Sequence, residues 1–460
     1  MFSRSATGKN VQNFLRGSYY AKSMSNRGLA TTSPRATSLT YGITDAAGVK
    51  IACNDVAGPT TRLAVVAKAG TRYQAVPGTA AGLSLFAFKN TSKRSALRIT
   101  REAELLGGQL KSYHNRELLV LEAKFLRQDL PFFTELLADV ISETRFTTHE
   151  FEEQVAPLMK LSQEKFAGDA SKVALDSAHS VAFHRGLGTS LYPNLLSPLF
   201  KYINSETISQ YSGISYSKKN IAIVANGADQ NDLTKWVGEF FTGVPTGASA
   251  LSDKPSTYYG GEERIHHPTG NSIVIAYPGS STLNGSSYKP EILVLTALLG
   301  GQSTIKWTKG FTLLAQATSK IPHLSTATSH IAYSDSGLLS IQLNGTPEAL
   351  RQASFEVHQT LKSIAEGRFS KEELIKAISL AKFRALDDAQ NFEASLFSTG
   401  VGILHGQKPY RLDEIGKTIA SVSAESLKAT AQEIVAKKAS VSTVGDLHVL
   451  PFAEEIGLKI

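Results

Sequence analysis

The chain has 460 residues, of which 42% are hydrophobic and 19% charged, and this balance excludes a disordered or low-complexity protein. Its length favours two or more domains, each large enough to bury a core. The single cysteine, Cys53, excludes an internal disulfide and a zinc or iron–sulfur site built from cysteines of this chain alone. The formal net charge is +8, but six of the basic residues behind it lie in the first 44 positions, where no acid occurs. The remaining chain is nearly neutral and does not indicate a nucleic-acid-binding protein.

Residues 1–36 have the composition of a mitochondrial transit peptide. Arg and Lys are spaced among Ser and Thr, and Phe2, Val11, Phe14 and Leu15 can share one helical face. A secretory signal needs an unbroken apolar core of about 7 to 15 residues, which this segment lacks. We therefore expect import into mitochondria, followed by removal of this leader.

Strand-like and helix-like segments alternate through the rest of the chain. In chain order the patterns predict a strand at 62–69, a helix at 79–89, a strand at 118–125, a helix after Pro131, a strand at 338–343 and a helix from Pro347. Both later helices carry apolar residues at three- and four-residue spacing. The longest apolar run, residues 292–299, is far below the ~18 residues that a membrane-spanning helix needs. The sequence therefore predicts no transmembrane segment, and any membrane association would be peripheral.

The two halves of the chain repeat one another. SYHNRELLVLEAKF from Ser112 aligns with AYSDSGLLSIQLNG from Ala332 at an offset of 220 positions. Two further pairs agree, at offsets of 223 and 219: Arg145-Phe146-Thr147 with Arg368-Phe369-Ser370, and Lys218-Lys219 with Lys437-Lys438. This period is too long for a solenoid and indicates a duplicated domain. We predict an N-terminal domain at 37–242, a linker rich in Gly, Pro and Ser at 243–261, and a C-terminal domain at 262–460.

His149 and the glutamates that follow it could form a metal-binding helix face, because residues three or four apart point the same way. A simpler interpretation is a helix start, since Thr147 and Glu150 have the spacing of a capping box. The equivalent pair in the second half, Ser370 and Glu373, has the same spacing. The repetition favours capping over metal binding.

Other candidates carry little signal. We interpret His179, His184 and the His266-His267 pair as packed or solvated side chains. Gly107-Gly108 and Gly300-Gly301 each follow a leucine pair, lack the spacing of a P-loop, and predict helix ends. Cys53 has no recognisable histidine partner, and no Gly-x-Ser-x-Gly elbow occurs. The residues by themselves indicate no catalytic, cofactor-binding or metal site.

Three strings together resemble the pitrilysin-type (M16) metallopeptidase family: AGTRYQ at 69–74, GTAAGLSLFAFKNT at 78–91 and LGGQLKSYHNRE at 106–117. Active members of that family carry an inverted zinc motif, His-x-x-Glu-His. Its two histidines bind zinc together with a more distant glutamate, and the motif glutamate activates water. The resemblance implies an α+β fold of two homologous α/β domains, each with a mainly antiparallel sheet backed by helices.

Aligned with that motif, the two histidine positions are Ala81 and Leu85, and the glutamate position is Ser84. The distant glutamate would fall near Ser162, beside Glu164. A methyl, an isobutyl and a hydroxymethyl group supply neither imidazole nor carboxylate donors for zinc. The resemblance therefore implies a chain with no metal, no cofactor and no peptidase activity.

The family includes the subunits of the mitochondrial processing peptidase and the core proteins of ubiquinol–cytochrome c reductase. The non-catalytic alpha subunit of the peptidase has a long glycine-rich loop that handles presequences, where this chain has only LLGGQSTIKWTKG at 298–310. This difference favours a core protein, with the presequence-binding alpha subunit as the alternative. A core protein would have an architectural role on the matrix side of the inner membrane. Its implied partners are core protein 1, cytochrome b, cytochrome c1, the Rieske iron–sulfur protein and the small subunits of a dimeric bc1 complex.

Overall fold

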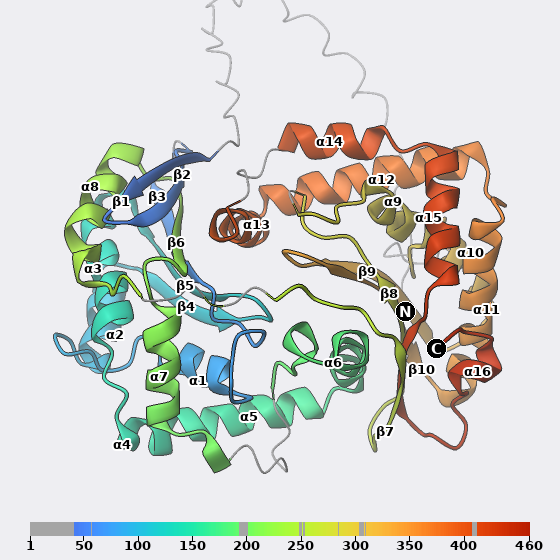
Figure 1. Ribbon diagram of the computed structural model, residues 1–460, viewed down its shortest axis with the longest axis horizontal. Helices are drawn as coiled ribbons and strands as arrows, with labels where there is room; N and C mark the ends of the chain where they lie inside the picture. Colours follow the sequence, from blue (N-terminus) through green and yellow to red (C-terminus); the bar gives the residue numbers. More distant parts are fainter. Residues whose placement is uncertain are drawn as a thin grey trace, which may run out of the picture. The chain divides into compact units, whose positions relative to one another are not determined.

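The computed structural model describes residues 41–460 except 57, 193–200, 248–250, 252–253, 284, 303–307, 309 and 407–411. The predicted leader at 1–36 lies outside the described residues, as do six of the thirteen residues of the 298–310 segment. Leu39–Ile460 form one compact unit. Each half of the chain contributes one sheet to it (Figure 1).

The first sheet has six strands in the order β1-β2-β6-β3-β5-β4. The β2–β6 pair is parallel and the other pairs are antiparallel. The strands are β1 (Gly42–Ala46), β2 (Val49–Asn54), β3 (Thr60–Ala67), β4 (Gln109–His114), β5 (Leu119–Leu126) and β6 (Ile221–Asn226). The central strands β3 and β5 are buried on both faces, as their nearly continuous apolar runs predict.

The helices of the first half are α1 (Thr79–Phe86), α2 (Ala96–Leu105), α3 (Leu130–Glu143), α4 (Thr148–Glu150), α5 (Ala156–Ala167), α6 (Ala170–Phe183), α7 (Ser205–Ser215) and α8 (Gln230–Phe240). Pro131 occupies the first turn of α3, as expected from its fixed φ. The buried face of α3 carries Phe133, Leu136, Leu137 and Val140 at helical spacing. This face packs into the main core of the first half.

The second sheet has five strands in the order β7-β11-β8-β10-β9, and only β7–β11 is parallel. The strands are β7 (Gly261–His266), β8 (Ser272–Pro278), β9 (Leu324–Ala332), β10 (Gly337–Gly345) and β11 (Ser440–Gly445). The helices are α9 (Pro290–Leu299), α10 (Leu313–Ala317), α11 (Pro347–Ala365), α12 (Lys371–Gln390), α13 (Phe392–Leu404), α14 (Leu412–Ala420), α15 (Ala424–Ala436) and α16 (Ala453–Ile456). No helix among the described residues has the length and hydropathy needed to cross a bilayer.

The predicted α+β class with two mainly antiparallel sheets is confirmed, and each predicted strand and helix is present. The predicted strands shift by up to two residues at their ends; the strand predicted at 62–69, for example, is β3 at Thr60–Ala67. The helix predicted for 79–89 ends at Phe86, because Ala87 has a ψ of 136° and Phe88 a φ of 62°, and neither is compatible with a right-handed helix.

One helix of each half packs on the sheet of the other half (Figure 1). Helix α6, from the first half, lies against β8 and β11, where Ala174 and Val444 share a buried cluster. Helix α13, from the second half, lies against β6, where Leu396 and Val224 share another. Each half is therefore completed by an element whose sequence lies in the other.

Candidate functional site

The positions aligned with the zinc motif lie on α1, which starts after Gly78 at a left-handed φ of 98°. The Gln74 side chain accepts hydrogen bonds from the Gly78 and Ala80 amides, both at 3.1 Å, and so satisfies two donors at the helix start. Ala81 is buried among apolar side chains of the first core. Ser84 is also buried, and Leu85 is half-buried.

Ala81 and Leu85 have no donor atom that could bind a metal, and Ser84 has only a hydroxyl group. The Ser84 hydroxyl lies 3.0 Å from the Ser112 hydroxyl on β4, so its hydrogen bond is made within the protein. On α5, Ser162 is half-buried and Glu164 is exposed to solvent. Within the described residues, no group of three His, Cys, Asp or Glu side chains is placed to hold a metal ion. The donor set present here does not fit zinc, which prefers imidazole, thiolate or carboxylate ligands.

The acidic segment after Thr147 begins a helix, as the capping interpretation predicts. The Thr147 hydroxyl accepts from the Glu150 amide, but the Glu150 carboxylate accepts from the Asn90 amide and the Thr147 hydroxyl, so the box is not reciprocal. At Ser370 and Glu373 both hydrogen bonds of the capping box are present. His149 is exposed, and its Nδ1 lies 3.2 Å from Glu153.

The glycine pairs also end helices, as predicted. Gly107 follows α2 with a φ of 68°, and Gly300 caps α9 with a φ of 61°. Of the histidines, His184 stacks on the Tyr259 ring at 4.1 Å between centroids, and His267 Nε2 lies 2.8 Å from the Ala167 carbonyl oxygen. Neither contact creates a catalytic arrangement.

Cys53 is buried, and its Sγ donates to the Ala228 carbonyl oxygen at 3.3 Å. Burial, followed by the nearby carboxylate of Asp55, raises the pKa of the Cys53 thiol to about 12. We expect the native chain to resist alkylation at pH 8, because the thiolate is the reactive form, and to react once unfolded. Intact-mass measurement after iodoacetamide treatment, with and without denaturant, checks this; stoichiometric labelling of the native chain would contradict it.

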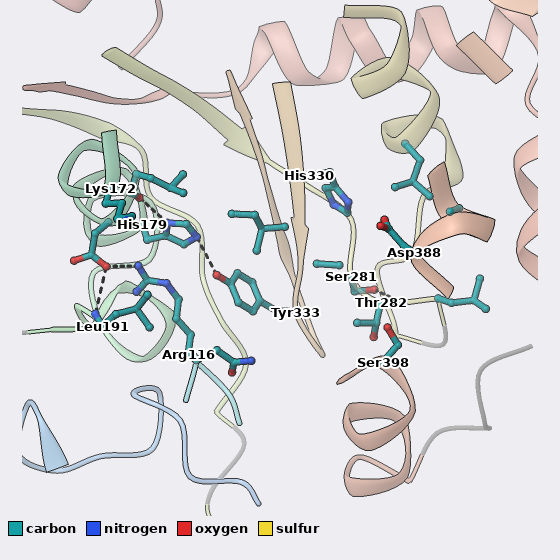
Figure 2. Close-up of a pocket in the computed structure, with 18 of the residues that line it drawn as sticks. Arg116, Lys172, His179, Leu191, Ser281, Thr282, His330, Tyr333, Asp388 and Ser398 are labelled. Atoms are coloured by element: carbon teal, nitrogen blue, oxygen red, sulfur yellow. Dashed lines mark hydrogen bonds and ion pairs between the residues drawn. The ribbon is translucent and has the colours of Figure 1, made fainter. Parts of the chain in front are cut away.

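A cavity with a volume of about 1000 Å³ lies between the two halves (Figure 2). The first half lines it with the β4–β5 turn and with α5 and α6, and the second half with β9, α9, α12 and α13. Ser162, near which the distant zinc-binding glutamate would fall, is part of this lining, whereas Ala81, Ser84 and Leu85 are not. The structure thus does not assemble the aligned positions around one open site.

One wall of the cavity is a hydrogen-bonded chain that crosses from half to half (Figure 2). His179 Nδ1 lies 2.7 Å from the Leu175 carbonyl oxygen and must carry the proton to donate there. Its Nε2 therefore accepts from the Tyr333 hydroxyl, at 2.9 Å. Burial, together with the nearby positive charge of Arg116, keeps the pKa of His179 well below its ordinary value. His179 is thus a neutral imidazole with both nitrogens occupied, which leaves it no free nitrogen for general-base catalysis.

On the opposite wall, burial shifts the pKa values of His330 and Asp388 toward their neutral forms. Burial lowers the pKa of His330 to about 4, and its Nε2 lies 3.0 Å from the Ser280 backbone nitrogen. Burial, and then repulsion from Asp387, raises the pKa of Asp388. Hydrogen bonding of this kind positions backbone and side chains, but it provides no nucleophile paired with a base.

A buried ion network joins the halves beside the cavity. The Glu117 carboxylate is fully buried and accepts from Arg72 Nη1 at 2.7 Å. It also accepts from the Ser334 hydroxyl at 2.6 Å and the Ser334 amide at 3.0 Å, across the boundary between the halves. Arg72 in turn donates to both oxygens of Asp335, at 2.9 and 2.7 Å. We refer to Arg72, Glu117, Ser334 and Asp335 as the junction cluster.

The junction cluster predicts an acid-sensitive contact between the halves. Burial of Asp335 opposes ionisation, but hydrogen bonds from Arg72 outweigh it and lower the pKa of this carboxyl. A lowered folded-state pKa stabilises the fold above the unfolded pKa, and this stabilisation is lost as pH falls through the folded value. We expect wild type to melt above Asp335→Asn at pH 7, with the gap closing below about pH 4. Melting curves across this range check it, and an unchanged gap at pH 3 would contradict it.

The sequence interpretation did not single out the junction cluster, although AGTRYQ, LGGQLKSYHNRE and the YSDSG turn contain its members. The alignment at offset 220 does pair Asn115 with Asp335, which places both hairpin turns at equivalent positions of the repeat. That signal marks the turns, but it does not show that they meet.

The duplicated, mixed sheets covered by helices define a class of peptidase-like proteins. The chain matches the family model described as insulinase (peptidase family M16) over residues 50–194. It also matches the model described as peptidase M16 inactive domain over residues 203–380. The chain therefore belongs to the M16 peptidase family.

Relatives from fungi to human carry the same name. The cytochrome b-c1 complex subunit 2 of Neurospora crassa is 50% identical over 463 residues, covering all of both chains. That of Yarrowia lipolytica is 36% identical and covers 90% of this chain and 96% of its own. The human protein of this name is 25% identical over 89% of this chain and 90% of its own.

Proposed function

We propose that this chain serves as the second core subunit of the mitochondrial cytochrome bc1 complex, where it supports assembly and stability and is not a catalytic peptidase. The observation that carries the proposal is the 50% identity to a b-c1 complex subunit 2 across the full length of both chains. The same name recurs among relatives at lower identity over about nine-tenths of the chain. These names favour the complex subunit over the alternative, a presequence-binding alpha subunit of the processing peptidase.

The non-catalytic role is supported by the residues on α1. Ala81, Ser84 and Leu85 stand where an active member would carry two histidines and a glutamate, and Ser84 is engaged by Ser112. Without those donors the chain should neither bind zinc nor polarise a water molecule. Metal analysis of the purified chain by mass spectrometry tests this, with less than about one-tenth of an equivalent of zinc expected. Stoichiometric zinc would overturn this part of the proposal.

The proposed setting is the matrix side of the inner membrane, reached after cleavage of the leader at 1–36. The proposed partners are core protein 1, cytochrome b, cytochrome c1, the Rieske protein and the small subunits. We also propose domain limits of 37–242 and 262–460, with 243–261 as the linker. These limits follow the sequence repeat, and they differ from the grouping by sheet because α6 and α13 each pack on the sheet of the other half. The proposed peripheral position is consistent with the finding that no helix among the described residues is long and apolar enough to cross a bilayer.

The deciding experiment is a mild-detergent native gel of mitochondria, probed for this chain and for the covalent haem of cytochrome c1. Co-migration in one large assembly is expected. A small heterodimer with a zinc-containing partner and without haem would replace the proposal with the processing-peptidase alternative.

A further inference from the structure

We infer that the two halves of this chain are complementary binding partners. Each half recognises the other through the helix, α6 or α13, that it packs on the other's sheet, and the halves remain bound after the linker is cut. The N half here means residues 41–247 and the C half residues 254–460. The interaction surface is the sheet face that each half leaves to the other's helix, and the partner that fits it is the complementary half. The linker between the halves is not needed to cover either sheet face.

Helix α6 is the docking element that the N half supplies. Four alanines one turn apart, Ala170, Ala174, Ala178 and Ala182, are buried together with Val274 and Val444 of the C sheet. Their short side chains let the helix lie close to the strands, and the contact buries apolar surface that neither half covers alone.

Polar contacts fix the register of α6 on the C sheet. The Ser177 hydroxyl donates to Glu263 at 2.5 Å and accepts from the Ser442 hydroxyl at 2.8 Å. Ser171 donates to Asn344 at 2.8 Å. The Ser177 and Ser442 hydroxyls are buried, so a shifted register of α6 on the C sheet would leave them buried without these partners.

Helix α13 is the docking element that the C half supplies, and it requires a glycine. Leu396 and Val401 are buried with Val66 and Val224 of the N sheet. At Gly400, a Cβ atom would lie only 2.9 Å from Val66 Cγ1, so the helix backbone sits directly on β3. Tyr41 adds a hydroxyl contact of 3.2 Å to Ser395.

A comparison of α13 with α6 explains why each half pairs with the other half and not with a second copy of itself. α6 and α13 begin 222 positions apart, within the 219–223 range of the repeat offsets, and aligning their starts places Ala178 opposite Gly400. If a second N half placed α6 where α13 lies, the Ala178 methyl would meet Val66 at a distance that real Cβ contacts do not show. Gly400 therefore favours the C half over a second N half as the partner of the N sheet.

The junction cluster adds charge-assisted contacts to the two helix surfaces. Glu117 and Arg72 of the N half bind Ser334 and Asp335 of the C half, all within hydrogen-bonding distance. Contact along three separate surfaces is consistent with Leu39–Ile460 forming one compact unit, not two.

The test uses the full chain with a protease site inserted within residues 246–252, which precede the junction contacts of Lys254 and Ser256. After complete cleavage, we expect the halves to co-elute at the volume of the uncut chain at about 1 µM, and to unfold in a single transition. Separation of the halves at this concentration, or two transitions, would overturn the inference.

Matched variants test which surface is responsible. In the cut protein we expect Gly400→Ala to raise the Kd between the halves at least about tenfold, because the added methyl meets Val66. Ala178→Gln should do the same on α6, whereas Ser180→Gln, on the exposed side of α6, should leave the Kd within about twofold. If Ala178→Gln fails to fold uncut, Gly400→Ala carries the comparison alone. An unchanged Kd for Gly400→Ala would show that this surface does not select the partner.

Discussion

Replacing Glu117 with alanine is expected to lower the free energy of unfolding by about 3–5 kcal/mol, the typical cost of breaking a buried ion pair by removing one partner. Glu117 is fully buried, and the Arg72 side chain is only 6% exposed. Removing the carboxylate leaves this guanidinium with Asp335 as its one carboxylate partner in the junction cluster, and leaves the Ser334 amide and hydroxyl without their acceptor. Because these groups belong to different halves, the loss weakens the contact between them.

A graded pair of variants separates charge from hydrogen bonding. Glu117→Gln keeps one carbonyl acceptor in nearly the same volume, so we expect it to lose less stability than Glu117→Ala. Glu104→Gln, on the exposed surface of α2, is the control and should stay within about 0.5 kcal/mol of wild type. Urea unfolding followed by circular dichroism measures all three. A Glu117→Ala variant as stable as the control would show that the junction cluster contributes nothing.

The second large effect is expected in the core of the N half, where Phe133→Ala should cost about 3–5 kcal/mol by creating a cavity. The Phe133 ring is fully buried and stacks on Phe125, with centroids 4.3 Å apart and planes 9° from parallel. It also lies over Gly108, where an added Cβ would come 2.3 Å from its Cζ atom. The ring therefore fills a space that a glycine keeps open.

This geometry predicts coupling between the two positions. Gly108→Ala alone should be destabilising, because the methyl group has no room beside the ring. Combined with Phe133→Leu, it should cost less than the sum of the two single changes. Phe311→Ala, at a side chain 71% exposed, serves as the control with little change expected. Additive losses in thermal or urea unfolding would contradict the proposed contact.

Local pattern was sufficient for the elements that depend on neighbouring residues. Pro131 and the apolar spacing after it predicted α3, and Ser370 with Glu373 predicted the cap of α12. Such features are decided within one or two turns of the chain, so the sequence carries them directly. The end of α1 was placed too late because the left-handed backbone at Phe88 has no signature in the pattern.

The candidate site divides in the same way. The predicted alignment of Ala81, Ser84 and Leu85 with the zinc motif needs only the sequence, and the chemistry of these side chains argues against zinc. The environment of His179 was not predictable, because its partner Tyr333 lies 154 positions away. Its low pKa comes from burial and from Arg116, and both depend on how the halves pack.

The sequence by itself indicated the duplicated design through residue types and their spacing, and it implied the α+β class through the resemblance of its motifs to the M16 family. Only the tertiary structure decided that α6 and α13 cross to the opposite sheets and that Arg72, Glu117 and Asp335 meet. Because each repeat contains its own strands and helices, the sequence suggests that each sheet is covered by helices of its own half. Whether a helix covers its own sheet or its neighbour's depends on the close fit of surfaces such as Gly400 on Val66, which local periodicity does not encode.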